Sequence, residues 1–332
     1  MEQTNIFDFN VEDKHYEYEK VFKKGQTIKL FEAFAGIGCQ AMAFKRAGIP
    51  YETVGISEID KYAIQSYNLI HDNVKNYGDI TKMVEIPKCD VFTWSFPCTD
   101  LSKAGKQKGL NGTRSGLVYE VLRLLLVTKD KPKVLIMENV PDLVQEKFKS
   151  EFYEIQKEIE SYGYKNFTQR LNAKHYGVAQ NRDRVFMVSI LGDYHYEFPT
   201  REKLKLRLKD YLEDSVDEKY YLSERQLEHI YITSFETKHF TQYARFNGHF
   251  ESEARVWKDI SPTITTKAQD IQIYDKNKIR NMTSRECWRL MGISDSDFDK
   301  VNGKVSNSQL YKQAGNGIVV DVFVKILKGL AE

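Results

Sequence analysis

The stretch FEAFAGIGCQA, residues 31–41, decides the fold class. It ends an apolar run at 27–34 that predicts a β-strand, and it opens a segment whose apolar spacing predicts a helix ending at Gly48. Gly36 and Gly38 allow a tight turn between these elements and let a ligand approach the backbone closely. A strand, a glycine turn and a helix in this order indicate the first βα unit of an α/β fold.

The same alternation continues to about residue 190. Further strands are predicted at 51–57, 90–96, 133–139 and 183–191, and helices at 61–71, 115–127 and 152–164. Strands separated by helices are typical of a parallel sheet. From about 192 to 280 the chain is rich in Lys, Arg, Tyr and His, and its strand signals are weak. The final stretch, 317–332, predicts an amphipathic helix apolar enough to pack back onto the first domain.

Composition places the chain among ordinary globular proteins, because 41% of its 332 residues are hydrophobic and 29% are charged. It has no apolar run of the ~20 residues that a membrane helix needs, and its start lacks a signal-peptide core, so we expect a cytoplasmic protein without membrane contact. Four separate cysteines, with no C-x-x-C pair or His cluster, indicate a reducing compartment and no metal site. A net charge of +2 neither requires nor excludes a nucleic-acid partner.

Two acidic residues suggest a nucleotide-like ligand near the glycine turn. Residues 36–41 fit G-x-G-x-x-A, and Glu58 ends the second predicted strand about 20 residues after Gly38, where a ribose-binding acid belongs. This pattern favours an adenosine-containing cofactor and leaves NAD and S-adenosylmethionine both open. Asp79, in GDI at the predicted end of a third strand, is an acceptor for an adenine amino group or simply a turn residue.

The stretch WSFPCTDLSKAG, 94–105, places a cysteine at the end of a predicted strand. Pro97 fixes the chain direction, and Cys98 lies at the sheet edge where ligands bind in open α/β folds. A buried inert thiol is the alternative, but backbone N–H groups and nearby positive charge favour an activated thiolate. The following residues suit a mobile loop that closes over a polyanion: Lys103, Gly105, Lys106, Lys108 and Gly109. Buried structural thiols are expected at Cys39, Cys89 and Cys287.

Two further motifs end on the same predicted edge. Glu138, in ENV, closes an apolar strand, where a carboxyl is costly unless it is paired or functional and where burial raises its pKa. QNRDR, 180–184, carries Gln180, Arg182 and Arg184 at alternate positions, which would face one side of a strand. Arginine there can hold the carboxylate or a carbonyl oxygen, whereas a solvated strand edge is the plainer interpretation.

In this order, FAGIG, Glu58, GDI, PCTDLS, TRSGL, ENV, QNRDR, RECWRLMGI and QAGNG resemble the DNA (cytosine-5)-methyltransferases over residues 27–192 and 283–332. The resemblance implies an α/β, Rossmann-like S-adenosylmethionine-dependent methyltransferase fold with a mixed sheet and a smaller irregular target-recognition domain. It favours S-adenosylmethionine over NAD, with S-adenosylhomocysteine as product. It also implies a catalytic and cofactor-binding domain at 1–192, a target-recognition domain at 193–282, and a hinge and returning helix at 283–332.

The resemblance also assigns roles to residues. Cys98 adds to C6 of a cytosine flipped out of duplex DNA, Glu138 contacts N3, and Arg184 holds O2 with Arg182 in support. The group that removes the C5 proton is not identified. The loop with Lys103, Gln107 and Gly109 closes over the flipped nucleotide. The expected cofactor residues are Phe34, Gly36, Gly38, Glu58, Ile59, Asp79, Ile80, Pro97, Leu117 and Asn316.

The expected partner is double-stranded DNA carrying a specific short sequence, in a restriction–modification system or a phage or orphan modification system. A cognate restriction endonuclease would act separately, and the enzyme would work as a monomer. In the target-recognition region, SPTITTKAQ, 261–269, most resembles the recognition loops of the family. The candidate base or phosphate contacts of this region are Arg245, Asn247, Arg255, Lys258 and Lys267.

Two positions depart from the family pattern. Gly317 stands where serine is usual, and Ala104 stands where some relatives carry a hydroxyl. The main alternatives are an RNA cytosine methyltransferase and an inactive DNA-binding module. The run PCTDLSKAG is closer to the DNA branch, and the complete set Cys98, Glu138 and Arg184 argues against an inactive module.

Overall fold

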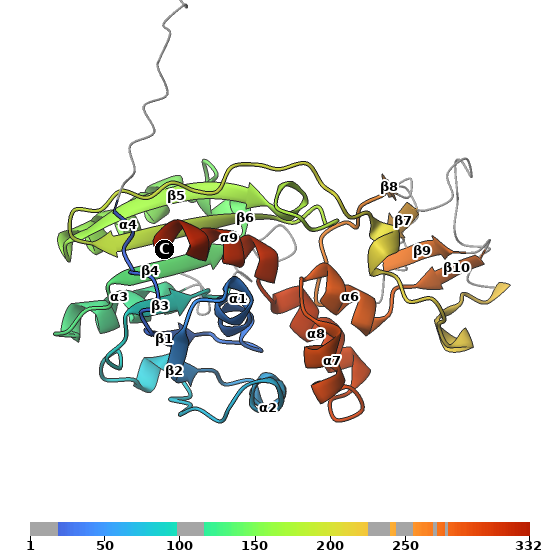
Figure 1. Ribbon diagram of the computed structural model, residues 1–332, viewed down its shortest axis with the longest axis horizontal. Coiled ribbons are helices and arrows are strands. Elements are labelled where there is room, and N and C mark those ends of the chain that lie inside the picture. Colours follow the sequence, from blue (N-terminus) through green and yellow to red (C-terminus); the bar gives the residue numbers. More distant parts are fainter. Residues whose placement is uncertain (1–18, 98–115, 225–239, 244–254, 268–270, 276–277) are drawn as a thin grey trace, which may run out of the picture.

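The computed structural model describes residues 19–97, 116–224, 240–243, 255–267, 271–275 and 278–332. Within this part of the chain, a mixed six-stranded sheet has the order β2-β1-β3-β4-β6-β5 (Figure 1). Its strands are β1 Ile28–Ala33, β2 Tyr51–Ser57, β3 Val91–Trp94, β4 Val134–Asn139, β5 Tyr164–Asn172 and β6 Asp183–Leu191. β1 to β4 run parallel, and β6 and β5 complete the sheet in antiparallel pairings, which gives the predicted α/β fold.

The local sequence explains the first βα unit. β1 is followed by a turn and then by helix α1, Cys39–Ala47. Gly38 precedes the helix with φ 78° and Gly48 ends it with φ 70°, and both angles lie in the left-handed region that glycine adopts without a Cβ penalty. The strand, the glycine turn and the helix stop at Gly48 are therefore confirmed.

Helices cover both faces of this sheet. Helices α1 and α9, Val320–Leu330, pack with Leu30, Val134 and Ile136 on one face. Helices α3, Leu117–Val127, and α4, Lys149–Ser161, pack with Phe92, Leu135 and Met137 on the other. Consecutive residues of β4 therefore enter opposite cores, as the two-residue period of a strand requires. Helix α2, Lys61–Ile70, begins at an Asp60 cap whose carboxylate accepts from the Tyr62 N–H.

Two local predictions near the sheet were wrong. The helix predicted through Tyr164 ends at Ser161. Gly163 then turns the chain with φ 92°, and edge strand β5 begins at Tyr164. The third strand predicted to end at GDI is not formed among the described residues, because Asn76 makes only an isolated bridge to Ile56. Asp79 instead caps the short 3-10 helix η1, Ile80–Lys82, by accepting from the Thr81 N–H.

A second sheet, which the sequence did not predict, lies at the far end of the molecule (Figure 1). In the described residues it has four antiparallel strands in the order β10-β9-β7-β8. Its strands are β7 Phe240–Tyr243, β8 Arg255–Lys258, β9 Ile271–Asp275 and β10 Lys278–Asn281. Strands this short give little periodic signal, and their pairing joins segments separated along the chain. The domain boundaries at 192 and 282 stay predictions.

Three helices lie between the two sheets: α6 Ser284–Leu290, α7 Asp295–Val301 and α8 Asn307–Asn316 (Figure 1). The chain then returns as α9, which packs against α1 and is tied to it by an Arg46–Asp321 ion pair of 2.8 Å. In the part of the chain that the structure describes, none of the helices is long and apolar enough to cross a membrane.

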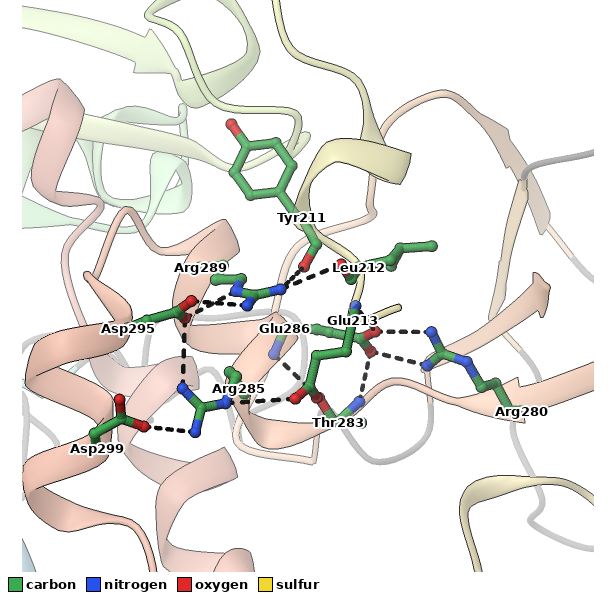
Figure 2. Close-up of polar contacts among 10 residues, drawn as sticks. All are labelled: Tyr211, Leu212, Glu213, Arg280, Thr283, Arg285, Glu286, Arg289, Asp295 and Asp299. Carbon is green, nitrogen blue, oxygen red and sulfur yellow. Dashed lines mark hydrogen bonds and ion pairs between the residues drawn. The ribbon is translucent and has the colours of Figure 1, made fainter. Parts of the chain in front are cut away.

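A buried charged network joins the second sheet to α6 (Figure 2). Arg280 of β10 and Glu286 of α6 are both fully buried, and their side chains meet at 2.7 Å. The Glu286 carboxylate also accepts from the backbone N–H of Thr283 at 2.8 Å and of Glu213 at 2.9 Å. One carboxylate therefore fixes β10, the start of α6 and the segment around residue 213 to one another.

Candidate functional site

The parallel strands bring the predicted residues to one edge of the first sheet. Phe34 directly follows β1, Glu58 directly follows β2, and Glu138 lies one residue before the end of β4. Pro97 comes shortly after β3, which lies between β1 and β4. Cys98 and the predicted closing loop with Lys103, Ala104, Gln107 and Gly109 lie outside the described residues. Their place in the site stays a prediction.

Glu138 and Arg184 form the charged pair at this edge. The Arg184 Nε lies 3.0 Å from the Glu138 Oε1, and only 10% of the Glu138 side chain and 17% of the Arg184 side chain are exposed. The pair is a charge contact without the alignment of a hydrogen bond at Oε1. Burial raises the pKa of Glu138, and the charges of Arg184 and Arg182 oppose that rise. The carboxyl therefore holds a proton more readily than an exposed glutamate does.

Asn139, whose side chain the sequence analysis did not consider, connects this pair to the strand that leads to Cys98. It is 3% exposed, and its Nδ2 donates to the Phe96 carbonyl at 3.1 Å, while its Oδ1 accepts from the Val140 N–H at 2.8 Å. The bond fixes the residue before Pro97 against the end of β4. An amide side chain at the end of a buried strand was the available signal, since buried polar groups are normally hydrogen-bonded.

Glu58 organises the predicted cofactor edge. Its Oε2 accepts from the Gly36 N–H at 2.8 Å, and its Oε1 accepts from the N–H groups of Ile59 and Asp60, each at 2.8 Å. The carboxylate thereby ties the glycine turn to the start of α2. Oε2 has a second lone pair, which is the acceptor that a ribose hydroxyl requires.

Phe34 and Ile59 border the same turn. Phe34 has φ 56°, a left-handed conformation that is strained for a residue with a large side chain and that recurs at ligand-binding sites. Ile59 is 73% exposed, so an isoleucine side chain lies at the surface directly beside the Glu58 carboxylate. An exposed apolar side chain next to a polar anchor suits a ligand in which a flat aromatic ring is joined to a group that carries hydroxyls.

Other predicted cofactor residues have mixed surroundings. Asp79 is at the surface, where the N–H and hydroxyl of Thr81 hold its pKa below the usual value. Ile80 is 3% exposed and its side chain packs in the core beside α3. Leu117 starts α3 and is half-buried, and Asn316 is exposed at the end of α8.

Helix α8 is fastened to the cofactor edge by side chains from its last turns. Lys312 makes an ion pair with Asp60 at 2.6 Å, and the Gln313 Nε2 donates to the Tyr62 carbonyl at 3.0 Å. Gly38 has no room for a side chain, because a Cβ there would lie 2.4 Å from the His71 ring and 2.7 Å from the Tyr67 ring. These contacts place the QAGNG segment beside the start of α2.

Glu32, a further residue that the sequence analysis missed, lies beneath the glycine turn. It is fully buried in β1 and accepts from the Tyr67 hydroxyl at 2.7 Å and the Ala41 N–H at 3.3 Å. It thus links the start of α1 to α2. Burial raises its pKa to about 7, against the opposing effect of these hydrogen bonds.

We expect Glu32→Gln to flatten the pH dependence of stability. The folded pKa of about 7 lies above the ordinary value of 4.5, so ionisation of Glu32 costs stability as the pH rises between these values. The glutamine side chain keeps a polar group there but does not ionise. The variant should therefore gain stability relative to the natural chain between about pH 5 and pH 7, measured by urea unfolding at several pH values. A constant difference across this range would show that Glu32 does not titrate there.

The three polar residues of QNRDR would share one face only if all lay on a strand, and they do not, because β6 begins only at Asp183. Arg184 alone of the three belongs to the strand, and it meets Glu138. Arg182 is 3% exposed and donates to backbone carbonyls of three residues, Ile264 at 2.8 Å, Gly317 at 2.8 Å and Gly315 at 3.0 Å. Arg182 still lines a small cavity with Glu138 and Arg184.

A separate hollow among the described residues lies away from this edge. It is a groove of about 500 Å³ between α1, α9 and residues 202–211. Its charged side chains include the pairs Arg46–Asp321 and Lys325–Glu202. None of the predicted catalytic or cofactor residues lines it, so its size does not identify the site.

The remaining predictions have separate outcomes. The expected buried thiols are confirmed at Cys39, Cys89 and Cys287, and burial raises the pKa of each. Among the candidate DNA contacts, Lys267 is exposed, whereas Arg245 and Asn247 lie outside the described residues. Arg255 and Lys258 belong to β8, and their roles stay predictions.

Comparison with known proteins agrees with this fold and shows the family of the chain. The family model described as C-5 cytosine-specific DNA methylase matches residues 28–332. The type II methyltransferase M2.ScrFI of Lactococcus lactis subsp. cremoris is 35% identical, with 91% of this chain and 99% of the relative aligned. The type II methyltransferase M.Bsp6I of Bacillus sp. is 32% identical, with 91% and 98% aligned.

Solved structures share the fold. The Entamoeba histolytica methyltransferase EhMeth superimposes with a TM-score of 0.71 at 16% identity, covering 92% of this chain and 98% of that one. The S. pombe Dnmt2 methyltransferase superimposes with a TM-score of 0.70 at 21% identity, covering 91% and 98%. Together with the catalytic motifs, these matches define a methyltransferase with a Rossmann-like fold. The chain belongs to the C-5 cytosine-specific DNA methylase family and is a DNA (cytosine-5)-methyltransferase.

Proposed function

We propose that this enzyme transfers a methyl group from S-adenosylmethionine to C5 of a cytosine within a specific short sequence of duplex DNA, with Cys98 as covalent catalyst. The observation that carries the proposal is the Glu138–Arg184 pair at the carboxyl edge of the sheet. Asn139 binds Phe96, two residues before Cys98, so the pair and the cysteine-bearing segment leave the sheet beside each other. This arrangement suits a nucleophile, a proton donor and a cation converging on one flat ring.

Each side chain has a chemical task. The Cys98 thiolate adds to C6 while Glu138 gives a proton to N3, so the ring becomes an enamine whose C5 is nucleophilic. Arg184 holds the O2 carbonyl and keeps Glu138 oriented. S-adenosylmethionine supplies the methyl group that C5 attacks. S-adenosylhomocysteine is the leaving group of the methyl transfer; a base then takes the C5 proton, the Cys98 thiolate departs and N3 returns its proton to Glu138, which restores the aromatic ring. Because these atoms are inaccessible in a stacked duplex, the base must leave the helix.

The residues at the cofactor edge fit an adenosine with a charged tail. Glu58 offers an acceptor for ribose hydroxyls, Ile59 offers an exposed apolar side chain, and Asp79 offers a surface carboxylate for an amino group. The strained Phe34 and the glycine turn supply close backbone approach. We propose Pro97, Leu117 and Asn316 as the remaining wall of this pocket, with Gly36 and Gly38 at its base.

The biological setting follows from the relatives. Several carry the name of type II methyltransferases and others of phage orphan methyltransferases. We therefore propose that this enzyme protects DNA in a restriction–modification or phage modification system. In the first case a cognate endonuclease would act separately, and the methyltransferase would work as a monomer in the cytoplasm.

The test is covalent trapping on duplex DNA in which 5-fluorocytosine replaces cytosine. Fluorine at C5 cannot leave as a proton does, so we expect a denaturation-resistant protein–DNA adduct that requires S-adenosylmethionine. Cys98→Ser should form no adduct, and tRNA should accept no methyl group. An active enzyme that methylates ordinary cytosine but never forms the adduct would contradict addition at C6.

A further inference from the structure

The QNRDR motif and the SPTITT run are bound together along their backbones. The Ser261 N–H donates to the Ala179 carbonyl and the Asn181 N–H donates to the Ser261 carbonyl, each at 2.8 Å. Gln180 and Ser261 form a parallel bridge, and both are fully buried. A segment just before β6 therefore aligns residue by residue with a segment far along the chain.

Side chains extend this pairing to Ile264. The Gln180 Oε1 accepts from the Ile264 N–H at 3.0 Å, and the Arg182 Nη1 donates to the Ile264 carbonyl at 2.8 Å. The Gln180 Nε2 donates to the Leu290 carbonyl of α6 at 2.7 Å, so both ends of its amide are engaged. The Thr263 hydroxyl donates to the Asn181 carbonyl at 2.7 Å. Gln180 and Arg182 of the QNRDR motif therefore bind both the N–H and the carbonyl of the buried Ile264.

Helix α8 holds the same run from another side. A Cβ on Gly315 would lie 2.2 Å from the Thr266 nitrogen and 2.3 Å from the Thr265 carbonyl carbon, so this backbone approach is open only to glycine. Arg182 donates to the Gly315 carbonyl at 3.0 Å as well as to Ile264. The run is thus held between the motif and the end of α8.

The hydrogen bonds that hold the 261–267 run end where the run reaches the surface. Residues 261 and 264 are buried, whereas Thr266 and Lys267 are exposed just before the segment that leads to β9. A hydroxyl and an ammonium at an exposed turn suit contacts with a phosphate or a base edge. At the other end, Arg184 follows Arg182 by two residues and holds Glu138. About two residues of extended chain, roughly 7 Å, therefore separate the fixed run from the catalytic pair.

We infer that Gln180 is a positioning residue that sets the register of the 261–267 run against the Glu138–Arg184 pair. The inference rests on the proposed function, because it takes this run as part of the DNA-contacting surface. Gln180 touches neither the base nor the cofactor edge; it acts through Ile264 and Leu290. Arg182 belongs to the same device, since its three backbone acceptors come from this run and from the α8 end.

The test compares two variants on unmethylated plasmid DNA. Gln180→Met keeps the side-chain length but removes both amide bonds, and we expect kcat/KM for plasmid DNA to fall about tenfold, the effect of roughly 1.4 kcal/mol. The dissociation constant of S-adenosylhomocysteine should stay unchanged, because the bonds of Glu58 are intact. Thr263→Val removes a single bond from the same pairing at nearly constant volume, so a smaller loss in the same direction is expected.

Ile155→Val, on the buried face of α4, is the matched control for a general loss of stability. Its unfolding free energy and kcat/KM are measured beside those of both variants. A fall in kcat/KM for plasmid DNA in Gln180→Met that is larger than in Ile155→Val supports the positioning role. Equal kinetics in all three proteins, or weakened cofactor binding in Gln180→Met, would overturn it. A natural enzyme that fails to trap 5-fluorocytosine DNA would instead refute the proposed function, so the two failures are distinguishable.

Discussion

Glu138→Gln is expected to lower kcat by about 10²- to 10⁴-fold, the usual contribution of a positioned acid or base. Glutamine keeps the shape of the side chain but cannot transfer its proton to N3, so the negative charge that develops on the ring after addition at C6 is left without a proton. The cofactor dissociation constant should change little, because Glu138 lies on β4 and the Glu58 contacts lie at β2 and the glycine turn. Single-turnover methyl transfer and calorimetric binding separate the two effects.

The pH profile provides a second readout for Glu138. Burial raises its pKa, and the proposed mechanism needs its protonated form, so we expect the rate of the natural enzyme to fall as the pH rises through that pKa. The glutamine variant should lack this decline. Glu120→Gln is a matched control, because Glu120 makes a 2.8 Å ion pair with the Nε of Arg123 on the more exposed surface of α3. Loss of cofactor affinity in Glu138→Gln, with chemistry unchanged, would give Glu138 a structural role instead.

Glu286→Gln should cost about 3–5 kcal/mol of unfolding free energy, because it leaves a buried guanidinium without its counter-charge. Arg280 and Glu286 are both fully buried, so water cannot compensate the charge (Figure 2). The backbone N–H groups of Thr283 and Glu213 bond to different oxygens of Glu286, so the single oxygen of glutamine can accept from only one of them, and the lost hydrogen bond adds to the loss of the ion pair. Urea unfolding of the full chain measures the effect.

Two controls isolate the buried charge. Asp295→Asn removes a charge from the Arg289–Asp295 pair of the same network, which is 2.7 Å long but partly exposed, and it should cost no more than about 1 kcal/mol. Adding Arg280→Met to Glu286→Gln should recover much of the lost stability, because no unpaired charge then remains. Equal losses in Asp295→Asn and Glu286→Gln would show that burial of the pair does not set its importance.

The local pattern of apolar and polar residues was sufficient to predict most strands of the first sheet. The strands at 51–57 and 183–191 were predicted with the bounds that the structure has, because short segments rich in apolar and β-branched residues are typical of strands. β5 was missed because it is an edge strand with several exposed polar residues, and such a strand carries no continuous apolar signal. The second sheet was missed because its short strands depend on partners elsewhere in the chain.

The candidate site divides in the same way. Glu138 and Arg184 were predicted together from their motifs, and the structure places them 3.0 Å apart. Asn139 and Glu32 were not identified, because a hydrogen bond to Phe96 or Tyr67 leaves no mark in the spacing of neighbouring residues. The alternation of Gln180, Arg182 and Arg184 left a shared strand face and a solvated strand edge both open, and the first two are instead buried outside β6.

The sequence by itself determined the α/β alternation, the glycine turn, the ordered motifs of the family and the two residues, Glu138 and Arg184, that the structure brings together. These features depend on residues that are close together in the chain or on an order of motifs that reading along it reveals. Only the tertiary structure decided where Gln180, Arg182 and Glu286 bind, and it did so because their partners lie on other segments. The Arg182–Ile264 bond, for example, joins residues 82 positions apart, a distance over which side-chain periodicity carries no information.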